Sequence, residues 1–221
     1  MKKIIPLLIF MFFSTYLFAQ DDEKAKFRIG LHISPQLSWM KPDVDSLSTS
    51  GIKPGFGYGV MFDVNIGANY AFSSGLTILN TGGTISFANA LVYKSDTFPT
   101  GTKIHHKLQY IEIPVLIKLK TNEIGYLTYY GQFGVTPGVN IKAKADITTV
   151  GNTDDKNNID INNEVKFLNL GLTIAGGVEY SVGGKTSLIG AIVFNNGFID
   201  MTADKNLVIL NNLILKLGIM F

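Results

Sequence analysis

Residues 207–221, LVILNNLILKLGIMF, end the chain in a pattern that decides the fold. Apolar side chains occupy every second position, namely Leu213, Leu215, Leu217, Ile219 and Phe221. Polar or small residues fall mostly between them, at Asn212, Lys216 and Gly218. A period of two indicates a strand with one apolar and one polar face. Because an apolar strand with an open edge invites aggregation, we expect it to pair with the first strand and close a barrel.

The same alternation recurs along the chain, most clearly over residues 27–39, 56–66 and 168–180. Residues 27–39 are long enough to cross a bilayer, which takes about 9–11 residues in a tilted strand. In a membrane barrel the apolar face turns outward to lipid and the polar face fills the lumen. Trp39 then lies where an aromatic girdle meets the membrane interface.

The connections between about eight predicted strands alternate in length. Polar loops are expected at 40–54, 84–105, 142–164 and 199–206, and short turns at 69–74, 121–125 and 181–185. Long loops at one end and tight turns at the other are typical of outer-membrane barrels. We therefore predict an all-β fold, an eight-stranded antiparallel up-and-down transmembrane β-barrel spanning residues 27–221, with the long loops facing out of the cell.

The N-terminus has the pattern of a secretory signal peptide over residues 1–20. Lys2 and Lys3 precede an apolar run, and cleavage is expected after Ala19 or Gln20. Residues 21–26 form a charged lead-in that we expect in the periplasm.

Composition excludes several classes of protein. The chain has no cysteine, so disulfides, thiolate metal sites and a lipid-modified cysteine are excluded. The net charge of +2 gives no strong field for nucleic acid. Beyond the signal peptide no stretch is long and apolar enough to form a membrane helix.

One strand carries a family resemblance. Residues 110–118, YIEIPVLIK, resemble the Tyr-Leu-Glu-Ile-Pro-Leu-Leu-Leu-Lys strand of the PorT-like outer-membrane β-barrel family. Tyr110, Glu112, Pro114 and Lys118 carry this motif, and the terminal residues 218–221 support it. The resemblance implies an eight-stranded barrel in a bacterial outer membrane and supplies no catalytic residues. We expect the terminal Phe221 to be the C-terminal assembly signal.

Pro114 interrupts the predicted strand, because proline cannot donate a hydrogen bond to a neighbouring strand. A closed barrel has no edge strand to accommodate it. We therefore expect a β-bulge or a local bend at this residue.

The inward face of the predicted barrel carries a set of ionisable residues, namely Arg28, His32, Asp63, Glu112, Lys118, Glu179 and Lys216. An eight-stranded barrel is just wide enough to be filled by its own side chains. Buried charges must pair, so we expect a balanced charge network that plugs the lumen. A proton relay or narrow polar path is the alternative.

Other polar clusters are poor candidates for chemistry. His105 and His106 are adjacent on a strand and point to opposite faces, so they cannot share one catalytic site. Residues 154–164 are rich in Asp and Asn but lack the spacing of a calcium-binding EF-hand loop. We predict no catalytic residue, no cofactor and no metal.

The sequence favours a non-enzymatic role, either structural in the envelope or partner-binding through the long outer loops. The expected partners are outer-membrane lipid, the barrel-assembly machinery and another envelope protein, with the chain itself a monomer. Two alternatives stay open. A narrow, porin-like passive channel needs unpaired lumen charges, and a soluble lipocalin-like binder of a hydrophobic ligand needs its apolar faces inside.

Overall fold

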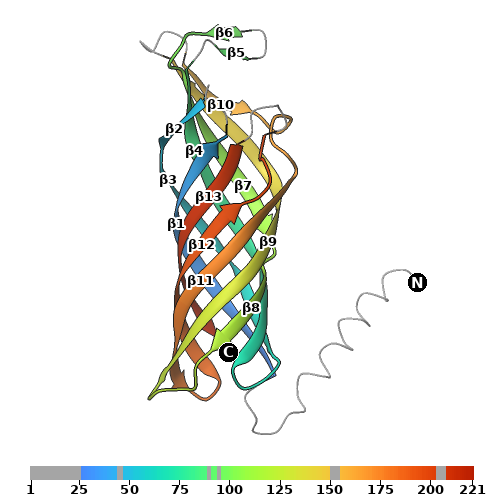
Figure 1. Cartoon of the computed structure of the whole chain (residues 1–221), viewed down its shortest axis with the longest axis vertical. Coiled ribbons are helices and arrows are strands. Elements are labelled where there is room, and N and C mark those ends of the chain that lie inside the picture. Colours follow the sequence, from blue (N-terminus) through green and yellow to red (C-terminus); the bar gives the residue numbers. More distant parts are fainter. Residues whose placement is uncertain (1–25, 44–46, 89–90, 94–95, 150–154, 203–207) are drawn as a thin grey trace, which may run out of the picture.

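The computed structural model describes residues 26–43, 47–88, 91–93, 96–149, 155–202 and 208–221 (Figure 1). The expected signal peptide and the lead-in up to residue 25 lie outside the described residues.

Long antiparallel strands form one closed ring in the described part of the chain. Its eight strand positions are β1 (Phe27–Pro42), β3 (Lys53–Asn65), β4 (Tyr70–Phe87), β7 (Lys103–Glu112) with β8 (Val115–Lys120), β9 (Leu127–Thr148), β11 (Leu168–Gly183), β12 (Thr186–Gly197) and β13 (Val208–Met220). Each strand pairs with its neighbours in chain order, and β7 and β8 share one position between β4 and β9. The predicted eight-stranded antiparallel barrel is confirmed.

The two ends of the sequence close the ring. Strand β1 pairs with β3 on one side and with β13 on the other, where Leu31 lies opposite Ile219. The backbone N–H of Phe221 donates to the carbonyl of Ile29 over 2.8 Å, which extends this seam to the last residue. The apolar edge of the final strand is therefore covered, as expected.

The barrel has two different ends (Figure 1). Short turns join β3 to β4, β8 to β9 and β11 to β12 at the end that we call lower. The upper end carries the long connections, which contain the short strands β2 (Leu47–Gly51), β5 (Leu91–Tyr93), β6 (Asp96–Phe98) and β10 (Lys156–Asp160). The predicted alternation of long and short connections is thus confirmed.

Large apolar side chains cover the outside of the lower and middle barrel. Leu31 is 56% exposed and Ile192 is 62% exposed, and neighbouring outward positions on all strands of the ring are similar. The intervening positions on β1, including His32, Ser34 and Gln36, are buried. This apolar belt faces outward, as in a membrane barrel and opposite to a soluble lipocalin-like barrel.

The polarity of the strands inverts above the belt. On β9, even-numbered residues such as Gln132 and Thr136 are buried, whereas beyond Ile141 the buried positions are the odd-numbered Ala143, Ala145 and Ile147. A register shift between Gln109 and Tyr110 of β7 leaves Ile141 as an extra residue on β9. The inserted residue moves all later side chains of β9 to the other face and so brings Ala143, Ala145 and Ile147 inside. On β7 the even-numbered residues stay inside throughout, and the inversion there lies in the sequence, from Glu112 below to Leu108 and Ile104 above.

One sequence-based expectation about these strands is wrong, and the bulge expected as one of two possibilities at Pro114 is absent. Residues 142–164 are not one long loop, because β9 continues to Thr148 and β10 pairs back onto it. Pro114 forms no bulge: the register between β4 and its partner is the same on both sides of it, with Thr77 opposite Glu112 and Ser74 opposite Val115. Residues 113–114 lie between β7 and β8 and belong to neither strand. The bulge lies higher, on β9 opposite Gln109 and Tyr110.

No helix among the described ranges is long and apolar enough to cross a membrane.

Candidate functional site

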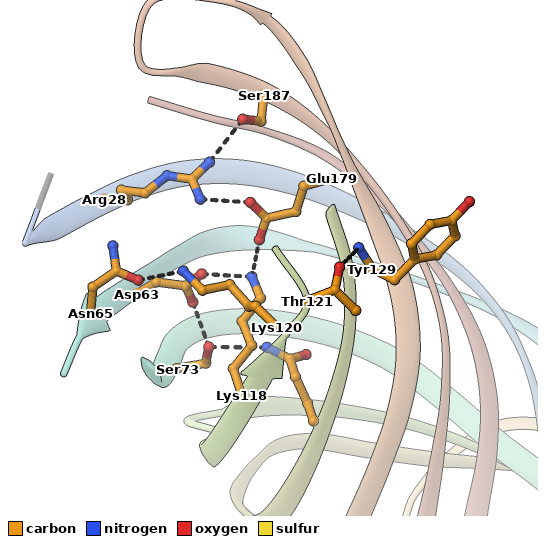
Figure 2. Close-up of polar contacts among 11 residues, drawn as sticks. Arg28, Asp63, Asn65, Ser73, Lys118, Lys120, Thr121, Tyr129, Glu179 and Ser187 are labelled. Carbon is orange, nitrogen blue, oxygen red and sulfur yellow. Dashed lines mark hydrogen bonds and ion pairs between the residues drawn. The ribbon is translucent and has the colours of Figure 1, made fainter. Parts of the chain in front are cut away.

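A network of charged side chains crosses the lower lumen (Figure 2). Lys118 on β8 lies between two carboxylates, forming ion pairs with Asp63 on β3, at 2.7 Å, and with Glu179 on β11. The guanidinium of Arg28 on β1 donates to Glu179 over 2.6 Å. Four residues from four strands thus form one chain of alternating charges, Arg28, Glu179, Lys118 and Asp63.

Polar and aromatic neighbours complete this network. Ser73 donates to Asp63 over 2.5 Å, and Gln132 donates to Ser73 over 3.0 Å. The ammonium of Lys118 also lies 4.2 Å from the ring centroid of Tyr130, a cation–π distance. The second amino group of Arg28 donates to Ser187 over 3.0 Å. Because every charge has a partner of opposite sign, burial is compensated.

The other predicted lumen residues lie higher and are held differently. The ring nitrogens of His32 are hydrogen-bonded to Ser34, at 2.9 Å, and to Thr77, at 3.2 Å. Glu112 and Lys216 line the same small cavity as His32 and interact electrostatically. Within the described part of the chain no direct ion pair joins them, so they do not extend the lower network.

Little free space lies beside these groups. A cavity of about 20 Å³ touches Asp63, Lys118 and Lys216, and another of about 30 Å³ touches His32, Glu112 and Lys216. A single water needs roughly 10–15 Å³ of such space, so the first cavity has room for one or two waters and the second for two or three. A larger recess of about 160 Å³ opens at the lower mouth beside Arg28 and Lys120.

Apolar side chains fill the lumen of the upper barrel. This upper core consists of Met40, Leu47, Ile85, Ile104, Leu108, Tyr110, Ala143, Ala145, Ile147, Ile161, Val165, Met201, Val208 and Leu210. They come from β1, β2, β4, β7, β9, β13 and the upper connections. The sequence pattern does not predict this core, because the bulge interrupts the alternation of β9 and the inward residues there include two alanines.

His106 lies fully inside the upper barrel. It is 8% exposed, and burial lowers its pKa to about 4, with the positive charge of Lys53 acting in the same direction. The ammonium of Lys53 donates to the backbone carbonyl of His106 over 2.8 Å. His105 faces the other way and bonds Thr84 over 2.9 Å, so the two histidines are on opposite faces, as predicted.

The family-like strand is divided between the two interiors. Tyr110 is buried in the upper core, whereas Glu112, Pro114 and Lys118 face the lower lumen. Phe221 is 50% exposed at the lower end of the β1–β13 seam. In the described ranges no group of three or more His, Cys, Asp or Glu residues is placed to hold a metal ion. The stretch rich in Asp and Asn at 154–164, where no metal site was expected, is described only from residue 155 onward.

Comparison with known proteins identifies the fold. A family model described as "Outer membrane protein beta-barrel domain" matches residues 18–203. The outer membrane protein OprG from Pseudomonas aeruginosa has a similar structure, with 11% identity and a TM-score of 0.51 over 90% of this chain and 96% of that one. This similarity supports the fold alone.

Two further structures are similar at lower scores. Neisserial surface protein A shares 16% identity at a TM-score of 0.49, over 88% of this chain and 96% of its own. The attachment invasion locus protein Ail of Yersinia pestis shares 13% identity at a TM-score of 0.44, over 89% and 99%. No curated protein shows significant sequence similarity to the chain.

Proposed function

Since the chain belongs to the outer membrane protein β-barrel domain family and is located in the bacterial outer membrane, we propose that it is a closed, non-enzymatic barrel that presents a rigid surface to a partner outside the cell. In this proposal the upper end faces outward, and the short turns and Phe221 face the periplasm. The narrower PorT-like membership is part of the proposal and is supported by the motif at residues 110–118.

The observation that carries the proposal is the continuation of the strands above the apolar belt. Strands β4, β7 and β9 extend upward with polar outer faces around a packed apolar interior. A loop that begins directly at the membrane would lose much conformational entropy on binding. A strand-built platform has already lost it, so its outer surface and loops bind at a lower entropic cost.

The lumen gives a second reason to favour display over transport. The lower network connects Arg28, Glu179, Lys118 and Asp63, and the upper core fills the lumen above it. A passive channel would require a continuous polar path past both. We expect the purified chain to leave the conductance of a planar lipid bilayer at its baseline, and stepwise channel openings would overturn the closed-barrel part of the proposal.

Site-specific photo-cross-linking in intact cells tests the display role. A photoreactive residue is placed at the outward position His105 of the upper barrel, and a control at Lys185 in a lower turn. We expect a discrete protein adduct at His105, and this adduct should persist after the exposed loops of other cell-surface proteins have been trimmed by a protease. We expect no adduct of the same size at Lys185. Equal adduct patterns at both positions, or none at His105, would contradict partner display.

A further inference from the structure

The outer surface of β7 and β9 carries a row of cations directly above the apolar belt. This basic strip consists of Lys103, His105 and Lys107 on β7 and Lys142 and Lys144 on β9. All are at outward-facing positions, and the side chain of Lys107 is 43% exposed. Two carboxylates lie beside the four lysines: Asp146, on the same face of β9, and Asp160, opposite Lys144 on β10. The strip therefore has an excess of positive charge.

The strand register brings like charges together. Lys107 and Lys144 are direct partners across the β7–β9 ladder. Like charges directly opposite each other on a sheet face destabilise the pair. Lys107 is compensated by an ion pair with Asp146 at 2.5 Å, whereas the ammonium groups of Lys142 and Lys144 have no side-chain partner among the described residues. Folding alone does not require this arrangement, but an anionic ligand stabilises it.

The lower part of the strip, formed by Lys107, Lys142 and Lys144, lies at the depth of the headgroup region of a bilayer, and His105 and Lys103 lie above it. On β9 the exposed residue directly below it is the apolar Ile141, which is 47% exposed, and on β7 the outward Gln109 is followed by the apolar Ile111. Lys142 follows Ile141 immediately, and Lys144 is two residues further, about 7 Å along the strand. Headgroups occupy roughly 5–8 Å beyond the hydrocarbon on each side. The ammonium groups of both lysines therefore reach headgroup phosphates while their aliphatic stems pack on the belt.

We propose that the basic strip binds the phosphate groups of phosphorylated glycolipid in the surrounding leaflet. The leaflet is the outer one, which rests on the orientation given under the proposed function. Residues paired across an antiparallel ladder have Cα atoms about 4.5–5.5 Å apart. Lys107 and Lys144 are thus close enough for both ammonium groups to contact one phosphate, and Lys142 contacts a second from below.

Lipid binding to the full-length mature chain in phosphatidylcholine nanodiscs tests the inference. Phosphorylated lipid A is added to both leaflets, so that the result does not depend on orientation, and bound lipid is counted by native mass spectrometry. We expect retention of phosphorylated lipid A that weakens as salt rises, and no retention of dephosphorylated lipid A. The double variant K142Q/K144Q should bind about thirtyfold more weakly, because each lysine near an anionic surface changes the affinity about fivefold.

Matched variants separate this site from general charge. K26Q/K185Q removes the same charge from two exposed lysines at the lower end and should bind like the unmodified chain. K142R/K144R keeps the charge and should retain binding, and heat-modifiable gel mobility verifies that each variant is folded. Equal weakening in K26Q/K185Q, equal binding of dephosphorylated lipid A, or displacement by inorganic phosphate at a matched phosphate concentration would each overturn the inference. None of these results depends on whether a protein partner is found, so failure here is distinct from failure of the display proposal.

Discussion

Arg28 and Glu179 are 151 residues apart in the sequence, yet their side chains form a 2.6 Å ion pair across the barrel lumen. They belong to β1 and β11, which are not neighbours in the ring. The pair therefore spans the interior as a chord, and Lys118 adds two more such contacts to β3 and β11. The charges in the lumen brace the ring from inside.

Removing the central cation should destabilise the barrel strongly. Lys118 is 1% exposed, and Lys118→Met leaves Asp63 and Glu179 buried with reduced compensation. Loss of one partner from a buried ion pair costs about 3–5 kcal/mol. We expect this loss in the free energy of unfolding, measured by urea titration in lipid vesicles.

A matched lysine provides the control for this experiment. Lys107 forms an ion pair with Asp146 at a half-exposed position, so Lys107→Gln should cost no more than about 1 kcal/mol. The double variant D63N/K118M removes the Lys118–Asp63 pair, leaves Glu179 paired with Arg28, and should recover part of the stability. Equal effects of Lys118→Met and Lys107→Gln would show that the network contributes nothing beyond a surface pair.

Close strand packing makes one glycine intolerant of a side chain. A Cβ atom at Gly59 would overlap the carbonyl oxygen and the Cα of the neighbouring backbone at Leu76 and Thr77. Gly59→Ala should therefore lower stability by about 1–3 kcal/mol or reduce the yield of folded barrel. Gly176→Ala is the control, since a Cβ there meets no atom within 4 Å. The folded fraction on an unheated gel gives the comparison, and a normal yield for Gly59→Ala would contradict it.

The single tryptophan reports where the membrane interface lies. Trp39 is the only tryptophan of the chain and stacks on Phe194 with ring centroids 6.2 Å apart. It stands at the upper edge of the apolar belt, one outward position below Lys41. We expect its fluorescence to be quenched more by lipids brominated near the headgroup than by lipids brominated near the chain end. Stronger quenching by lipids brominated near the chain end would show that the upper edge of the apolar belt lies above Trp39.

The upper core should loosen at mildly acidic pH. The pKa of His106 is lowered from 6.5 to about 4 by burial, so the unfolded chain binds a proton below pH 6.5 that the folded chain does not bind until about pH 4. Stability is therefore full above pH 6.5 and falls as the pH drops towards 4, by up to about 1.4 kcal/mol per pH unit. The protection factors of the β7 and β9 amides, which are exchange rates corrected for the intrinsic pH dependence of amide exchange, should fall over this range.

Replacement of the histidine should remove this pH dependence. His106→Leu cannot take up a proton, so the protection factors in β7 and β9 should become nearly constant between pH 6.5 and 4. His105→Gln, at the outward neighbouring position, should leave the fall in protection intact. If His106→Leu and the unmodified chain respond equally to acid, another group causes the effect.

The belt and the ring were predictable because they depend on one local rule. Alternation at Leu31 and Ile33, or at Leu213 and Leu215, marks the outward face, and one apolar face on each strand leaves a closed membrane barrel as the stable arrangement. The alternating loop lengths gave the direction of the strands. These signals lie within short stretches of chain and need no knowledge of the strand register.

The interior pairings were not predictable in the same way. Alternation places Lys118, Asp63 and Glu179 in the lumen, but their pairing depends on the register of four strands around the ring. Glu112 and Lys216 have the same inward pattern and make no such pair among the described side chains. Tyr130, Ser73 and Gln132 carry no charge and gave no signal. The upper core was missed because the bulge at Ile141 reverses the alternation beyond it.

The composition of the upper core also constrains the order of events during folding. Met40 comes from the first strand, Ile147 from the middle of the chain and Leu210 from the last strand. These side chains meet only when residues far apart in sequence have been brought together, which is slow because the contacts are non-local. We therefore expect the core to be completed only once β13 is in place beside β1. Protection of the backbone amides of β9 above Ile141 from hydrogen exchange should therefore appear when the membrane ring is complete, and the time of its appearance measures the time of assembly.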